Sequence, residues 1–122
     1  MDRLVTMLSA GVAAVMLSGS AWAANEMPVS ATQIEAAKTP ADHEAIATAY
    51  DKEAARLESM AKDHVAMARS YRAAAGGTKG SAPAAMAAHC NKLMTQYEAA
   101  AQENRALAAA HRQMAKDCCA GK

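Results

Sequence analysis

Larger apolar and aromatic side chains recur with a seven-residue period in two long stretches of the chain, residues 40–75 and 82–118. No helix-breaking residue interrupts either stretch after its first turn. A seven-residue period places these side chains on one face of an α-helix, as in coiled coils. The pattern therefore predicts two helices, each of about 36 residues and about 54 Å.

The two stretches share one heptad pattern, which we write with positions a to g. Position a holds His43, Tyr50, Leu57, His64 and Tyr71, then Cys90, Tyr97, Asn104, His111 and Cys118. Position d holds Ile46, Glu53, Met60, Met67 and Ala74, then Met86, Leu93, Ala100, Leu107 and Met114. Position e is alanine in both stretches except at Met94. We expect a and d to form the contact between the helices, with the alanines allowing close approach.

Capping signals bound the two helices. Thr39 precedes Pro40, and an acidic residue, Asp42, follows at the third helical position, which is typical of a helix start. Gly76 is placed to end the first helix in the left-handed conformation, and Ser81 to cap the second. The prediction is a hairpin over residues 39–119, with helices at about 40–75 and 82–118 and a tail at 120–122. Residues 24–38 form a flexible lead, in which the spacing Thr32 to Glu35 fits the capping box of a short helix.

A six-residue turn between matching heptads predicts an all-α antiparallel hairpin. A turn centred between residues 78 and 79 pairs residues whose numbers sum to 157. Position a of one helix then faces position d of the other, and Glu53 faces Asn104 as a polar layer that fixes the register. Other predicted layers are His64 with Leu93, Met67 with Cys90, Ile46 with His111 and His43 with Met114.

The second helix also resembles a copy of the first. Tyr50, Met60, His64 and Met67 align with Tyr97, Leu107, His111 and Met114 at a constant offset of 47. Tyrosine, histidine and methionine are rare enough here that the match favours an internal duplication over a shared alanine-rich composition.

Composition supports helices and argues against other classes. The chain has 122 residues, 35 of them alanine, no phenylalanine, and 13 basic against 12 acidic residues. Alanine favours helices and is depleted in strands, so a sheet protein is disfavoured. The balanced charge without a basic block argues against nucleic-acid binding.

The first 23 residues have the pattern of a secretory signal peptide. An apolar run over residues 4–17 follows Arg3, and the segment closes with Ala21-Trp22-Ala23, which suits cleavage after Ala23. No further segment is apolar and long enough to be a transmembrane helix. We therefore expect the mature protein in the periplasm or secreted.

The predicted register gathers soft metal-ligand side chains into two clusters. The cluster near the turn contains His64, Met67, Cys90, Met86 and Met94, and the cluster near the open end contains His43, His111, Met114 and Cys118. Each has a His-x-x-Met pair, whose side chains share one helix face. Imidazole, thioether and thiolate ligands together suit Cu(I) or another soft metal ion. The alternative is that methionine fills gaps in the core and histidine is half-buried at the contact.

Three cysteines in an oxidising compartment leave one unpaired. Cys90 and Cys118 lie 28 residues apart on one helix, about 42 Å, so they cannot bridge each other. The vicinal pair Cys118-Cys119 suits disulfides to a partner or metal binding. Alternatively, Cys90 is a free buried thiol and Cys119 forms an intermolecular bridge.

No phosphate-binding loop, haem motif or nucleophile with an orienting partner occurs, so we expect no enzyme. We expect a non-catalytic envelope protein that acts by binding or assembly, most specifically by binding a soft metal. The alternatives are a structural or partner-binding coiled coil, in contact with another envelope protein, and a bundle that responds to pH through His43, His64 and His111. Because a hairpin buries little surface alone, we also expect a homodimer that forms a four-helix bundle.

The segment Thr39-Pro40-Ala41-Asp42-His43-Glu44, with Tyr50 and the His64-x-x-Met67 spacing, resembles small exported alanine-rich helical-hairpin proteins of proteobacteria. The resemblance covers about residues 32–117. It implies a periplasmic helical hairpin and brings no activity or functional residues with it.

Overall fold

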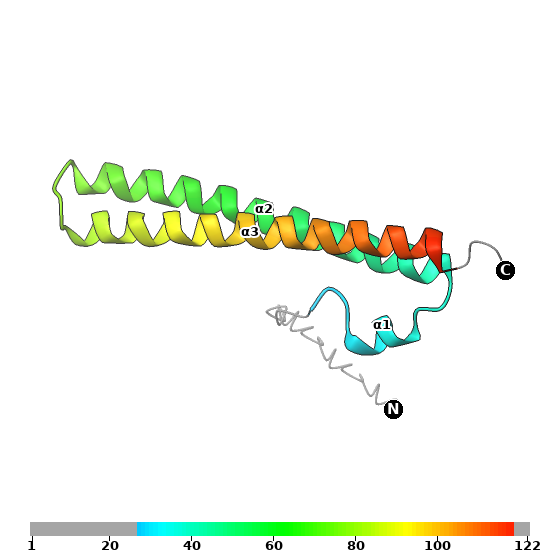
Figure 1. Ribbon diagram of the computed structural model, residues 1–122. Helices are drawn as coiled ribbons and strands as arrows, with labels where there is room; N and C mark the ends of the chain where they lie inside the picture. The colour runs from blue at the N-terminus through cyan, green and yellow to red at the C-terminus, as the bar shows by residue number, and fades with distance from the viewer. Residues whose placement is uncertain (1–26, 119–122) are drawn as a thin grey trace, which may run out of the picture.

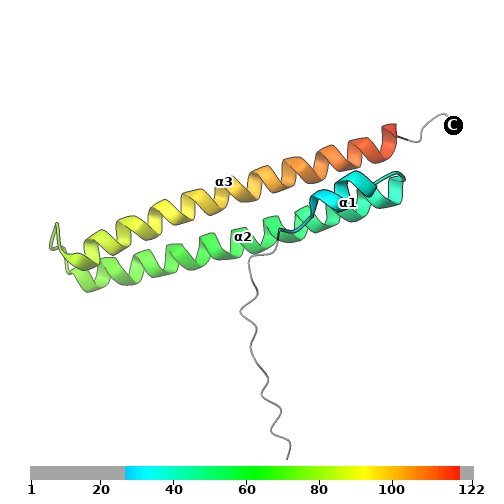
Figure 2. The same cartoon turned by 90° about the horizontal axis from the view of Figure 1, so that it is seen from below.

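The protein folds as an antiparallel hairpin of two long helices, in a computed structural model that describes residues 27–118 (Figure 1). The short helix α1 spans Ala31–Ala36, α2 spans Pro40–Ala75 and α3 spans Ala82–Asp117. The two long helices lie side by side over their lengths in both views (Figure 2). The predicted all-α hairpin is confirmed, and its long helices lie within one residue of the expected bounds. The predicted signal peptide at residues 1–23, Cys119 and the tail lie outside the described residues.

The start of α2 is fixed by a reciprocal cap. The Thr39 hydroxyl accepts a hydrogen bond from the Asp42 backbone N–H at 3.1 Å, and the Asp42 carboxylate accepts one from the Thr39 N–H at 2.9 Å. The same carboxylate accepts a bond from the Lys38 N–H at 2.9 Å. These bonds hold the pKa of Asp42 below its usual value. They satisfy N–H groups that the helix itself leaves without partners.

The turn between the long helices uses residues that tolerate unusual backbone angles. Gly76 ends α2 with φ of 56°, the left-handed conformation in which a side chain is strained. Ser81 then caps α3, where its hydroxyl accepts a hydrogen bond from the Ala84 N–H at 3.4 Å. Both residues act at the helix ends as their positions in the sequence predicted.

The lead before α2 begins its helix earlier than the sequence suggested. Ser30 is the N-cap of α1 and forms a capping box with Gln33, so the predicted box from Thr32 to Glu35 is wrong. The two boxes have the same spacing, and the one that forms starts directly after Val29. Val29 is buried in a cluster with Ile46 and Tyr50.

Small residues form the centre of the contact between α2 and α3. Seven alanines at position e are buried, namely Ala47, Ala54, Ala61, Ala68, Ala87, Ala101 and Ala108. The larger residues beside them at position a include Tyr50, Leu57, Cys90 and His111, which are buried too. The helices therefore pack through a and e, with alanine against alanine, and not through a and d.

Because the helices pack through positions a and e, the pairs of residues that face each other differ from the predicted layers. The alignment of the two helices along their lengths stays as predicted. Residues at position d lie at the edge of the contact, and of these only Ile46 is buried in the described chain. Position a now faces position a of the other helix: His64 stacks on Tyr97, not on Leu93, and His111 contacts His43 and Tyr50. Alanine explains the rotation, because a row of single methyl groups at position e lets the backbones approach more closely than the larger side chains at position d would allow.

The position b residues of both helices form a ladder of polar contacts on one face of the hairpin. Arg112 pairs with Asp51 at 2.6 Å and with Glu44 at 3.2 Å. Arg105 pairs with Glu58, and the Arg72 guanidinium donates to the Asn91 side-chain oxygen at 2.9 Å. All of these residues occupy position b. Since b and d lie on opposite sides of the a/e contact, the hairpin has one polar face and one face formed by position d.

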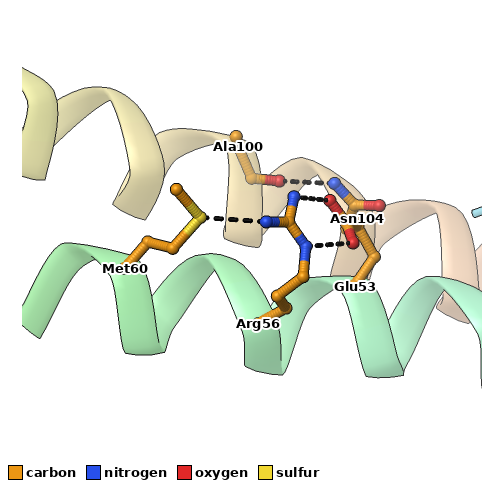
Figure 3. A network of polar contacts seen from close by, with 5 residues as sticks. All are labelled: Glu53, Arg56, Met60, Ala100 and Asn104. Carbon is orange, nitrogen blue, oxygen red and sulfur yellow. Dashed lines mark hydrogen bonds and ion pairs between the residues drawn. The ribbon is translucent and has the colours of Figure 1, made fainter. Parts of the chain in front are cut away.

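The expected polar layer of Glu53 with Asn104 does not form, because each side chain bonds within its own helix (Figure 3). Glu53 takes a bidentate contact from the Arg56 guanidinium, at 2.6 and 2.8 Å. Asn104 donates to the Ala100 backbone oxygen at 2.9 Å. Arg56 also donates to the sulfur of Met60 at 2.9 Å. This pair therefore does not fix the register of the two helices.

Within the described residues, neither long helix carries an apolar stretch sufficient to cross a membrane.

Candidate functional site

Two histidines from different helices meet at the open end of the hairpin. The Nδ1 atoms of His43 on α2 and His111 on α3 lie 3.1 Å apart, and the ring centroids are 5.4 Å apart. His111 is buried and His43 is half-buried. The Tyr50 ring, two turns after His43 on α2, stacks on His111 at 5.9 Å between centroids. The a/e packing creates this meeting, since it directs position a of each helix toward position a of the other.

The surroundings of His111 favour its uncharged ring. Burial lowers the pKa of His111, and the charge of a protonated His43 lowers it further. Two neutral imidazoles at 3.1 Å can share one proton, with one Nδ1 as donor and the other as acceptor. A neutral imidazole with an available nitrogen lone pair is also the form that binds a metal.

A second ring pair lies nearer the turn. His64 stacks on Tyr97 with centroids 5.4 Å apart and planes 18° apart. The Nδ1 atom of His64 is buried, and no hydrogen-bond partner for it occurs in the part of the chain that the structure describes. A buried polar nitrogen without a partner costs free energy, so this atom calls for an explanation.

The two ring pairs are related by the predicted offset of 47. Adding 47 to Tyr50 gives Tyr97, and adding 47 to His64 gives His111, so the stack of Tyr50 on His111 is repeated with the helices exchanged. This repetition supports an internal duplication and an approximate two-fold axis through the hairpin.

The offset of 47 also gives the counterpart of His43, the residue that faces His111. His43, which faces His111, corresponds to Cys90. Cys90 is a buried free thiol on α3. Cys90 is therefore the counterpart of His43 in the second cluster.

The predicted methionines are farther from the contact than expected. Met67 and Met114, the methionines of the His-x-x-Met pairs, are exposed at position d, as is Met86, whereas Met94 is half-buried at position e. Met67 therefore does not pack against the buried Cys90 as the layers predicted. Met67 and Met114 each follow their histidine by one turn on the same edge of the contact.

Cys118 is exposed and disulfide-bonded, so its sulfur is not available as a thiolate ligand. The open-end cluster is thereby reduced to His43, His111 and Met114. The two clusters then have matching members under the offset of 47. His43 corresponds to Cys90, His111 to His64 and Met114 to Met67.

Over residues 27–118, no group of three or more His, Cys, Asp or Glu side chains is placed to hold a metal ion. Metal binding would thus need a sulfur ligand from methionine beside two other donors. Sequence reasoning missed the ring contacts of Tyr50 and Tyr97 with the histidines. The offset of 47 contained that signal, because it relates both tyrosines and both histidines.

Comparisons of the chain with known protein families, with curated proteins and with solved structures find no match.

Proposed function

We propose that this chain is a non-catalytic, exported binding protein that holds a soft metal ion, Cu(I) or a similar ion, between its two long helices. The observation that carries the proposal is the 3.1 Å separation of the His43 and His111 Nδ1 atoms across the hairpin. An ion bound to both nitrogen atoms at about 2.0 Å would have an N–metal–N angle of about 100°. That angle suits a three- or four-coordinate ion.

The remaining ligand at the open end is assigned to the thioether of Met114. It is one turn from His111 on the same edge of the contact, and its exposure leaves the flexible side chain room to turn toward the pair. Imidazole and thioether together select a soft ion over magnesium or calcium, which prefer oxygen. At the other cluster, His64, Cys90 and Met67 would supply a nitrogen, a thiolate and a thioether.

A titration with Cu(I) in competition with a Cu(I)-specific chelator tests the proposal. We expect binding tighter than micromolar, which is lost at one site in H43A/H111A and at the other in H64A/M67A. His89→Ala is the matched control, because His89 is an exposed histidine of α3 outside both clusters. Binding no tighter than micromolar, or binding unchanged in both double variants, would contradict the proposal.

A second candidate is assembly, with the histidines as ordinary core residues. The observation in its favour is a row of exposed large apolar side chains on α3, all at position d. In that case the hairpin is a structural coiled coil that binds another copy or an envelope protein. The metal content of protein purified from the periplasm separates the two candidates, since assembly alone predicts none.

The proposed location in the periplasm or outside the cell rests on the signal-peptide pattern of residues 1–23. The N-terminal residue of the secreted protein tests it. Sequencing should begin at Ala24, and a mature protein that retains Met1 would refute export by this signal.

A further inference from the structure

One face of the hairpin is mainly apolar, and the described chain covers it only at the open end of α2. On α3 the exposed large hydrophobic residues are Met86, Leu93, Leu107 and Met114, at 44, 37, 44 and 47% exposure. They occur at intervals of seven or fourteen residues, with Ala100 at the intervening position, so all occupy position d. We call this surface, together with position d of α2, the d face. A solvated helix has no reason to confine its exposed hydrophobic residues to one heptad position.

The opposite face differs in chemistry. There, position b carries the ladder in which Arg105 and Arg112 pair with acidic residues of α2. Most of the polar side chains at position b therefore already have partners within the hairpin. The hairpin as a whole is thus amphipathic, which is the arrangement of half of a four-helix bundle.

The chain itself shows that the d face can be covered. Ile46 belongs to the d row of α2 and is only 6% exposed, because Val29 from the lead packs against it. Met67, three heptads farther along the same row, is 40% exposed. Helix α1 lies beside the open-end part of α2 and does not extend toward the turn (Figure 2). The rest of the row needs a cover that the lead does not supply.

The charge in the d rows does not oppose burial. Glu53 is their only charged residue, and Arg56 neutralises it through the bidentate contact described above. That contact lowers the pKa of Glu53 and keeps the pair charged and hydrogen-bonded. The d rows themselves therefore carry no uncompensated charge in either helix.

We infer that a second copy of this chain covers the d face, so that two hairpins form a four-helix bundle. A second hairpin has the same heptad period and the same length of 36 residues per helix, and its d rows can interdigitate with the first over the part of the face that the lead leaves open. The full face is about 54 Å long and about 20 Å wide, which gives about 1,000 Å² per copy before the open-end part of α2 that the lead covers is subtracted. A standard stable interface needs about 800 Å² per partner. A two-fold dimer uses the same surface patch on both subunits, so one d face can serve both copies.

This inference deepens the assembly candidate above and does not depend on metal. Light scattering and sedimentation equilibrium at high micromolar concentration test it on the mature protein, with reductant and chelator present to remove disulfide and metal links. We expect twice the monomer mass for the wild type. L93E/L107E should lose the dimer, because it places uncompensated charge at the centre of the interface, while circular dichroism shows helix content unchanged.

Val65→Glu is the matched control. Val65 is also 40% exposed and hydrophobic, but it occupies position b on the opposite face, so V65E should remain a dimer. M86K/M114K provides a second d-face variant should L93E/L107E fold poorly, and it too should be monomeric. A monomeric wild type, or a dimer that survives both d-face variants, would overturn the inference. Because chelator is present throughout, either result leaves the metal proposal to be judged by its own titration.

Discussion

Ala54 of α2 and Ala101 of α3 lie in one core cluster at the middle of the hairpin, and they are separated by the repeat offset of 47 residues. Each is therefore the equivalent of the other, and the approximate two-fold axis passes beside their contact. Glu58 and Arg105 are also 47 residues apart and pair with each other on the polar face. The symmetry thus relates the core and the surface of the hairpin alike.

Ala54→Leu should destabilise the protein, since Ala54 has no exposed surface and faces another alanine at close range. Added methylene groups in a tightly packed contact cost about 1–3 kcal/mol through displaced backbone and strained side chains. Chemical denaturation monitored by circular dichroism measures the change in the free energy of unfolding. The control is Ala55→Leu at the adjacent exposed position, which should alter stability little. Equal effects of the two substitutions would refute close alanine packing.

The sequence was sufficient to predict the helices because local signals specify them. Thr39, Gly76 and Ser81 act through bonds and angles within a few residues, so their roles follow from position alone. The face used for packing was predicted less well. Assigning methionine and leucine to the contact follows their greater hydrophobic area, whereas the distance between the backbones depends on which small residues meet across it.

The candidate site shows the same division between local and non-local information. Its residues were found from the sequence, but their pairing was not, because a rotation of each helix exchanges position d for position e. His43 was expected to face Met114 and instead meets His111. The disulfide of Cys118 and the intrahelical bonds of Glu53 and Asn104 likewise depend on side-chain choices that a heptad pattern does not determine.

Removal of the α2 cap should weaken the hairpin at its open end. Thr39→Ala deletes the hydroxyl that accepts the Asp42 N–H, and loss of such a cap costs about 1 kcal/mol. Thr48→Ala is the control, because the Thr48 hydroxyl only bonds back to the Glu44 carbonyl inside the helix and alanine is the better helix former. Thermal melts should give a lower midpoint for T39A than for the wild type, and T48A should not fall below the wild type. The reverse order would contradict the capping role.

Gly76→Ala should also destabilise the hairpin, through the backbone alone. A methyl group at this residue meets no atom within 4 Å, so no clash arises. The φ of 56° is nevertheless a left-handed conformation, which costs an L-residue about 1–2 kcal/mol. Gly76→Asn is the informative comparison, since asparagine tolerates this conformation better than alanine does. Denaturation should rank the wild type first, G76N second and G76A last, and an unchanged G76A would mean that the turn relaxes to another conformation.

Acidification should weaken the hairpin before the carboxylates titrate. The pKa of His111 is lowered in the folded state, so below its ordinary value of about 6.5 the unfolded chain binds more protons than the folded one. Stability therefore falls as the pH drops through 6.5 toward the lower folded pKa. Glu53 and Glu58 have lowered pKa values as well, and their contributions persist until more acidic pH.

The measurement is the melting temperature between pH 7.5 and 5.5, with chelator present so that bound metal does not mask proton binding. The wild type should melt at a lower temperature at the acidic end. His111→Gln should remove most of this dependence, because glutamine keeps a polar side chain at the contact without a titrating ring. His89→Gln, a change at an exposed histidine of the same helix, should retain it. A melting temperature independent of pH in the wild type would show that the His43–His111 pair accepts a proton without loss of stability, contrary to the burial of His111.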